Sequence, residues 1–190
     1  MPEITDQDDY GAALKKIQRL GLTILFEELK QILTDFALNV KESKDANGGA
    51  AVRKLMDLRF QSAGGWIQKV TGAVDWTKCR IVNGTQVCIG VELQFSARSD
   101  LVVIDIIHLR RAITTGVIDV GVLVVPNNRL GPFLVDRGPK IADARRHIKE
   151  TRAEDLPLIV IGIEHDGPGE PLPKQLKRSI KKTIRKNKKS

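Results

Sequence analysis

The spacing of hydrophobic positions changes about a third of the way along this chain. In the first part, apolar residues recur every three or four positions, which is the period of a helix with one buried face. This spacing and the glycines that follow it predict helices over 9–20, 23–40 and 50–62. In the second part the apolar residues alternate with polar ones or form continuous runs, which are typical of strands. The pattern therefore indicates a helical first part and a mixed second part.

The second part begins with a predicted hairpin, whose strands cover 74–81 and 86–95. Between them, Asn83-Gly84 favours the two positive backbone angles that a type I′ turn requires. The elements expected after the hairpin are an almost entirely apolar, buried helix over 101–115, a strand over 117–125, a helix over 140–151 and a strand over 158–163. This order predicts an α/β fold with a central mixed sheet flanked by helices.

The basic residues of the chain are unevenly placed. The chain has 31 Lys or Arg and 23 Asp or Glu, for a net charge of +8. Residues 171–190 contain nine of the basic residues and no acidic one, so residues 1–170 are close to electrically neutral. We therefore expect a single domain over 1–170 and a basic tail over 171–190, with helical apolar spacing, that faces a polyanion. This placement argues against a uniformly basic protein that coats DNA.

Several classes of protein do not match the sequence. No apolar run reaches the roughly 18 residues of a membrane-spanning helix. The first ten residues are acidic and lack a signal-peptide pattern, so we expect a cytoplasmic protein. Cys79 and Cys88 are too few for a disulfide scaffold, and no His lies near them at the spacing of a zinc site.

Two carboxylates of the predicted hairpin are expected to lie side by side. Pairing the strands about Asn83-Gly84 places Asp75 opposite Glu92, and Gln94 lies two positions further along, on the same face as Glu92. Two carboxylates so close together repel each other, and a divalent cation such as Mg²⁺ relieves this. Such an ion can also activate water at a phosphodiester. The alternative is that both are ordinary solvent-facing residues of the hairpin.

Several segments, taken in order, resemble type II restriction endonucleases of the BamHI/BglII kind. Enzymes of this nuclease superfamily carry an Asp followed by Glu-x-Lys, and in this group by Glu-x-Glu or Glu-x-Gln. Asp75 followed by Glu92-Leu93-Gln94 has the Glu-x-Gln form. The other segments that resemble the family are 116–126, 134–137, 158–163 and 177–182. The resemblance covers roughly residues 64–190 and implies a restriction-endonuclease-like fold.

The resemblance implies a role for each residue of the predicted site. Asp75, Glu92 and the backbone carbonyl of Leu93 would bind Mg²⁺, for which Mn²⁺ should substitute. Gln94 stands where other members have Lys or Glu, and it can only orient water because an amide is no base near neutral pH. Gln68 falls near a fourth polar residue of the family, although an ordinary surface glutamine is the alternative.

The resemblance also indicates residues that contact DNA. Asp136 and Arg137 can together read one G·C pair, because Arg bonds guanine and Asp accepts from cytosine; the alternative is a surface ion pair. Other candidates are at the start of the apolar helix, in a Gly-rich loop and in the basic tail: Arg98, Ser99, Asn47, Lys177, Arg178, Lys181 and Lys182.

The function that the resemblance implies is Mg²⁺-dependent cleavage of both strands of a short palindromic DNA site. The products would carry 5′-phosphate and 3′-hydroxyl ends, with 5′ overhangs. A homodimer would match a palindrome, and the host would need a cognate DNA methyltransferase. The alternatives are a repair or recombination nuclease of the same superfamily and a catalytically inactive DNA-binding protein.

Overall fold

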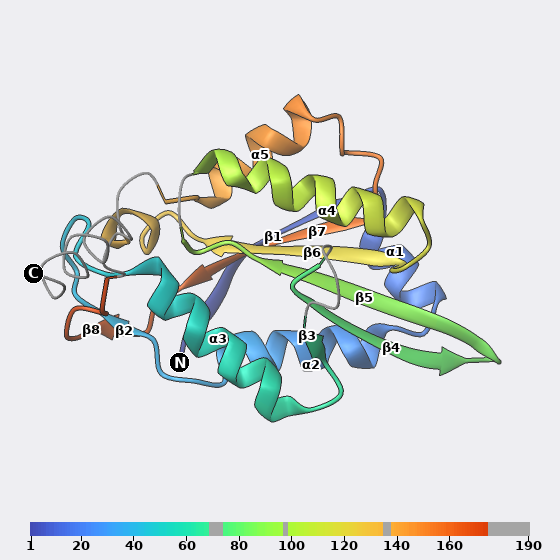
Figure 1. Ribbon diagram of the computed structural model, residues 1–190, viewed down its shortest axis with the longest axis horizontal. Helices are drawn as coiled ribbons and strands as arrows, with labels where there is room; N and C mark the ends of the chain where they lie inside the picture. Colours follow the sequence, from blue (N-terminus) through green and yellow to red (C-terminus); the bar gives the residue numbers. More distant parts are fainter. Residues whose placement is uncertain (69–73, 97–98, 135–137, 175–190) are drawn as a thin grey trace, which may run out of the picture.

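The computed structural model describes residues 1–68, 74–96, 99–134 and 138–174, and Figure 1 shows how their elements are arranged. The elements in chain order are β1 (Glu3–Tyr10), α1 (Ala13–Arg19), α2 (Thr23–Thr34), β2 (Asn39–Val40), α3 (Gly49–Ala63), β3 (Ile67–Gln68), β4 (Trp76–Val82), β5 (Thr85–Leu93), α4 (Val102–Thr114), β6 (Val120–Pro126), α5 (Ile141–Glu150), β7 (Leu158–Glu164) and β8 (Gly167–Pro168). Within these residues no helix is long and apolar enough to cross a membrane.

Six strands of the described chain form one mixed sheet in the order β1-β7-β6-β5-β4-β3. The central strands β5, β6 and β7 are parallel, and the other neighbours pair antiparallel. Every residue of β6 and β7 is buried, as expected for strands whose two faces are both covered by helices. The short strands β2 and β8 pair separately. The predicted α/β fold with a central mixed sheet is confirmed.

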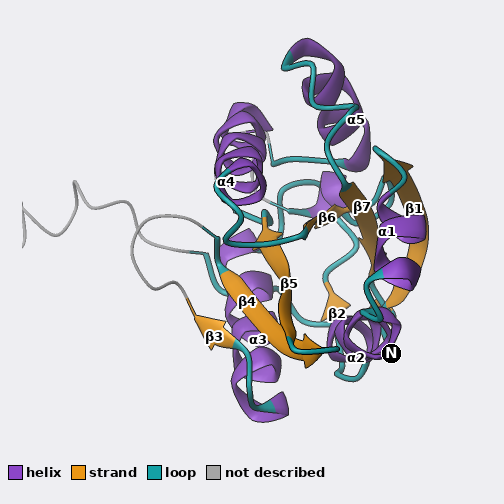
Figure 2. Ribbon diagram, turned by 90° about the vertical axis from the view of Figure 1, so that its right-hand side faces the viewer, coloured by secondary structure: helices purple, strands orange, loops and turns teal. Residues whose placement is uncertain are grey.

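Helices cover both faces of this sheet (Figure 2). The apolar residues of α1, α2 and α3 pack on one face with alternate residues of β5 and β6, such as Val91 and Val122. Residues of α4 and α5 pack on the opposite face, against side chains such as Cys88 and Leu123. Because side chains alternate between the faces of a strand, Glu92 points to the α4 side of β5.

The β4–β5 hairpin has the register predicted from its turn. Val82 pairs with Thr85 across Asn83-Gly84, and at the other end Trp76 pairs with Val91. Asn83 and Gly84 have positive φ angles of 49° and 78°, as a type I′ turn requires. The next position of this register places Asp75 opposite Glu92.

Helix α3 starts against the end of β5. A Cβ atom added to Gly49 would lie 1.7 Å from the carbonyl oxygen of Phe95, so only glycine allows this approach. The contact brings the first turns of α3 beside the same end of the hairpin where Asp75 lies.

Two elements in the first part of the chain differ from the sequence prediction. Residues 3–10 form an edge strand, and α1 begins at Ala13 instead of residue 9. The helix predicted over 23–40 ends at Thr34, because beyond it the apolar spacing changes to alternation and the chain enters β2. Cys79 and Cys88 face each other in the hairpin and form a disulfide, which is a single local bond and no scaffold.

Candidate active site at the end of the β4–β5 hairpin

Asp75 and Glu92 lie together in the protein interior. Asp75 is 8% exposed and Glu92 is 2% exposed. Burial alone would raise the pKa of Asp75, but a hydrogen bond shared with Glu92, the charge of Arg53 and the Leu93 amide together hold it below its usual value. The Leu93 amide donates to Asp75 Oδ2 at 3.0 Å. The structure therefore keeps an ionised carboxylate in a mostly apolar layer.

An arginine of α3 joins Asp75 to the backbone of β5. Arg53 Nη2 lies 2.9 Å from Asp75 Oδ1, and Nη1 donates to the Leu93 carbonyl oxygen at 2.7 Å. Its Nε donates to both carboxylate oxygens of Asp57, one turn further along the helix. Asp57 in turn accepts a hydrogen bond from the indole of Trp76 at 2.9 Å.

Helix α4 supplies the other side of the site. His108 Nδ1 lies 3.1 Å from Glu92 Oε1, and the Gln94 amide nitrogen donates to Asp105 Oδ2 at 2.8 Å. Ligand atoms of Glu92, Asp105 and His108 all lie within 4.8 Å of one another, an arrangement that could hold a metal ion. The predicted Asp75, Glu92, Leu93 and Gln94 thus lie together with two further potential metal ligands from α4, Asp105 and His108.

Four residues of this site were missed by sequence reasoning: Arg53, Asp57, Asp105 and His108. Asp105 and His108 did carry a signal, because residues three apart on a helix share a face and this helix follows the predicted site strand. Arg53 and Asp57 are four apart on α3 but distant in sequence from Asp75. Their participation depends on how α3 packs, which no local pattern reveals.

The other predicted residues are placed as follows. Gln68 is exposed and pairs with Trp76, the neighbour of Asp75, across β3 and β4. Ser99 is partly exposed and lines a surface pocket of about 380 Å³ that also contains Lys44 and Lys140. The remaining candidates lie outside the described residues: Arg98, Asp136, Arg137, Lys177, Arg178, Lys181 and Lys182.

Asn47 has a different role in the structure from the predicted contact with DNA. Its side chain is fully buried, and its amide nitrogen donates to the carbonyl oxygens of Lys41 and Phe133. Its side-chain oxygen accepts from the backbone amides of Lys41 and Leu172. These bonds join three segments that are far apart in the sequence. Asn47 therefore fixes the loop before α3 instead of facing a ligand, which corrects that prediction.

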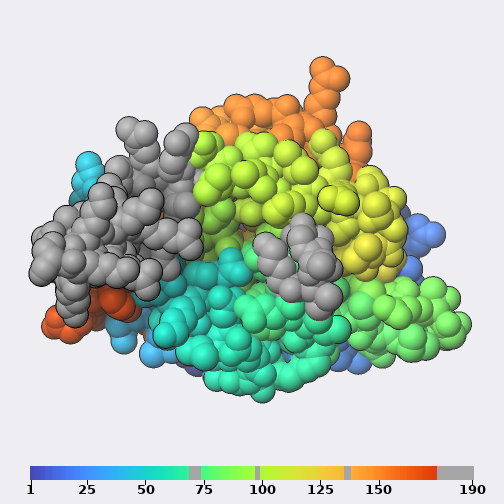
Figure 3. Space-filling model, viewed as in Figure 1, coloured from blue at the N-terminus to red at the C-terminus, as the bar shows by residue number. Residues whose placement is uncertain are grey.

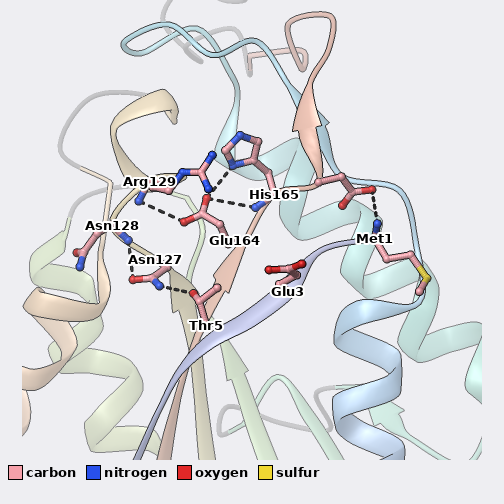
Figure 4. Close-up of a pocket in the computed structure, with 9 residues that line it drawn as sticks. Met1, Glu3, Thr5, Asn127, Asn128, Arg129, Glu164 and His165 are labelled. Atoms are coloured by element: carbon pink, nitrogen blue, oxygen red, sulfur yellow. Dashed lines mark hydrogen bonds and ion pairs between the residues drawn. The ribbon is translucent and has the colours of Figure 1, made fainter.

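A second polar hollow of about 280 Å³ lies where β1 meets the ends of β6 and β7 (Figure 4). The side chain of His165 is completely buried there, with Nδ1 2.7 Å from Glu164 and Nε2 2.9 Å from Glu42. Glu164 also accepts a hydrogen bond from the Arg129 backbone amide. These bonds connect strand ends and loops, so we assign this cluster a structural role.

Comparison with known proteins finds one family whose model matches this chain. The model of the family described as restriction endonuclease BglII/BglIII matches residues 13–163, which is most of the chain. The match spans α1 to β7 and includes every residue of the site at the hairpin end. A search of curated proteins finds no match.

Proposed function

This chain belongs to the BglII/BglIII family of restriction endonucleases, and on that premise we propose that it cuts DNA with a divalent metal ion bound at Asp75 and Glu92. Membership of the family makes the protein a site-specific deoxyribonuclease that acts on double-stranded DNA. The observation that supports the proposed site most strongly is the convergence of two buried carboxylates at the position that the family's Asp and Glu-x-Gln pattern indicates.

The donor atoms at the hairpin end fit a divalent cation. Asp75, Glu92 and the Leu93 carbonyl offer the hard oxygen ligands that Mg²⁺ prefers. On the α4 side, Asp105 and the imidazole of His108 add a mixed oxygen and nitrogen set that Mn²⁺ also accepts. We therefore propose Mg²⁺ as the cofactor and Mn²⁺ as a substitute. The bound ion would acidify the attacking water and neutralise charge on the phosphate.

Gln94 is proposed to act by position instead of by proton transfer. An amide has no basic group near neutral pH, so Gln94 can only orient other groups. Its nitrogen holds Asp105 beside Glu92, which leaves its carbonyl oxygen as the acceptor that would orient the attacking water. The expected reaction is in-line hydrolysis that leaves 5′-phosphate and 3′-hydroxyl ends.

DNA recognition is proposed for residues outside the hairpin, in the predicted loops and in the basic tail. We keep Asp136 and Arg137 as readers of one G·C pair, and Arg98 and Ser99 as contacts to bases or phosphates. The pocket beside Ser99 is lined by Lys44 and Lys140 and also by Asp45 and Asp143. The two lysines are the groups there that could contact a phosphate, because lysine is a common phosphate ligand. Four of the nine basic residues of the tail, Lys177, Arg178, Lys181 and Lys182, would add phosphate contacts.

We also propose that the enzyme acts as a homodimer. The predicted burial of the whole 101–115 helix is wrong on one side, since Ile104 and Ile107 of α4 are 45% and 48% exposed. Helix α4 lies at the surface of the molecule (Figure 3), so this apolar side is accessible to a second copy. A twofold dimer would place one site on each strand of a short palindrome. From the resemblance to the family we propose that the two cuts leave 5′ overhangs. A methyltransferase in the host would protect its own sites.

Two substitutions test the proposed site. Asp75→Ala and Glu92→Ala should each abolish Mg²⁺-dependent cutting of plasmid DNA and retain DNA binding in a gel-shift assay. Asp155→Ala, which removes an exposed carboxylate far along the chain, is the control and should cut normally. Cutting that survives either site substitution would disprove the site. Structure-dependent nicking in place of discrete fragments would favour a repair nuclease, and no cutting under any condition would favour an inactive DNA-binding protein.

A further inference from the structure

Arg53 uses the same oxygen atoms that the proposed metal ion needs. Its two terminal nitrogens form a fork, with Nη2 on Asp75 Oδ1 at 2.9 Å and Nη1 on the Leu93 carbonyl at 2.7 Å. Both partners are proposed ligands of the ion. Mg²⁺ bonds its ligands at about 2.0–2.1 Å and demands near-ideal octahedral geometry. A guanidinium placed between these two oxygens and an ion bound to both therefore compete for the same space.

The position of Arg53 is set by its surroundings. Asp57 holds its Nε with two hydrogen bonds of 3.0 and 3.2 Å, and Trp76 holds Asp57. Trp76 is itself buried and stacks on Phe60, with ring centroids 5.1 Å apart. Burial alone would lower the pKa of Arg53, but the charges and hydrogen bonds of Asp75 and Asp57 raise it overall, so the side chain stays charged.

The same arrangement gives Arg53 a way to leave Asp75. The side chain of Arg53 is 25% exposed, so part of it is in contact with solvent. Asp57 lies on the same helix, and its ion pair with Arg53 involves neither Asp75 nor Leu93. A guanidinium that released Asp75 and Leu93 would therefore keep a carboxylate partner, which lowers the cost of its release.

We propose that Arg53 is an internal cation that competes with the metal ion for Asp75 and the Leu93 carbonyl, and so sets the metal concentration that cleavage requires. This inference rests on the metal site of the proposed function. A purely structural ion pair would stabilise Asp75 alone, whereas Arg53 also takes the backbone carbonyl that completes the proposed ligand set. Arg53 would therefore act on cleavage through Asp75 and the Leu93 carbonyl, without touching the reacting atoms.

Binding of Mn²⁺ to the full-length protein without DNA tests this proposal directly. The free Mn²⁺ concentration can be followed by electron paramagnetic resonance, and circular dichroism checks that each variant is folded. Arg53→Met should lower the Kd for Mn²⁺ by about tenfold, because the ion would no longer have to displace Arg53 from Asp75. A hydrogen bond to a charged group contributes enough free energy to change a Kd by about a factor of ten. Arg59→Met is the matched control, since it removes the same charge from the same helix at its surface pair with Asp35, and its Kd should not change.

A second variant keeps the test valid if Arg53→Met does not fold. Arg53→Lys retains the charge but has no planar fork to hold both oxygens, so it should lower the Kd several-fold. A Kd that is unchanged or higher in the folded Arg53 variants would overturn the proposal and leave Arg53 as a structural partner of Asp75.

Asp75→Asn separates this failure from failure of the proposed function. If the wild type cuts DNA and Asp75→Asn does not, an unchanged Kd in the Arg53 variants overturns only the competition. If the wild type neither binds Mn²⁺ nor cuts DNA, both the proposed function and the competition are overturned.

Discussion

Replacing Asp75 by asparagine should destabilise the fold at neutral pH. The carboxylate accepts hydrogen bonds from Arg53 and from the Leu93 amide on its two oxygens. Although burial opposes ionisation, the contacts with Glu92, Arg53 and Leu93 outweigh it and hold the pKa of Asp75 below its usual value. A lowered pKa means that the ionised form is favoured more in the folded protein than in the unfolded chain. Ionised Asp75 therefore contributes to stability.

The size of this contribution follows from the contacts that asparagine cannot replace. Its single carbonyl oxygen can serve one of the two donors, so one hydrogen bond to a charged group is lost. Such a bond contributes about 1.5–3 kcal/mol, and we take about 2 kcal/mol as the expected loss in the free energy of unfolding. For a domain of this size, that loss lowers Tm by roughly 4–8 °C.

Thermal unfolding followed by circular dichroism at a series of pH values measures this loss. Because the pKa of folded Asp75 is lowered, its stabilisation is present above the pKa of the unfolded chain and disappears as the pH falls through the folded value. The Tm difference between wild type and Asp75→Asn should therefore be largest near pH 7 and shrink in acid. Asp155→Asn is the control and should match the wild type throughout. An Asp75→Asn protein as stable as the wild type at neutral pH, or a difference that grows in acid, would refute this reasoning.

Three further predictions concern activity and assembly. Gln94→Glu should retain Mg²⁺-dependent cleavage in a plasmid assay, because either side chain can orient water; complete loss would contradict the orienting role. Deleting residues 174–190 should weaken DNA binding in a filter assay and flatten its dependence on salt, since phosphate contacts release counterions; an unchanged salt slope would show that the tail makes no such contacts. Ile107→Glu should shift the protein towards monomer in sedimentation velocity and reduce double-strand cutting, because a charge in an apolar interface is costly; a dimer of unchanged stability would place the interface elsewhere.

Much of the site could be predicted because its geometry is local. The Asn83-Gly84 turn fixes the register of its own hairpin, and that register alone places Asp75 opposite Glu92. The same argument places Gln94 on the α4 side of β5. The helices over 49–63 and 102–114 and the buried strands were also predictable, because their spacing and β-branched runs are strong local signals.

The parts that could not be predicted depend on contacts between distant segments. Strand β1 has an alternating but mostly polar sequence, and its Asp6 and Asp8 are held by Arg145 of α5. Arg53 reaches Asp75 only because Gly49 lets α3 start against the end of β5. The role of Asn47 likewise depends on the distant Phe133 and Leu172. Each of these features depends on tertiary packing, which the periodicity of hydrophobic residues in the sequence does not predict.

The central claim is that this chain is a metal-dependent restriction endonuclease, and the ends of its DNA products test that claim most directly. A Mg²⁺ digest of mixed DNA by the wild type, sequenced at the fragment ends, should give discrete fragments that share one short palindrome, with 5′-phosphate ends and 5′ overhangs. A parallel digest with Asp75→Ala should give none. Fragments without a common sequence, or identical fragments from Asp75→Ala, would contradict the account.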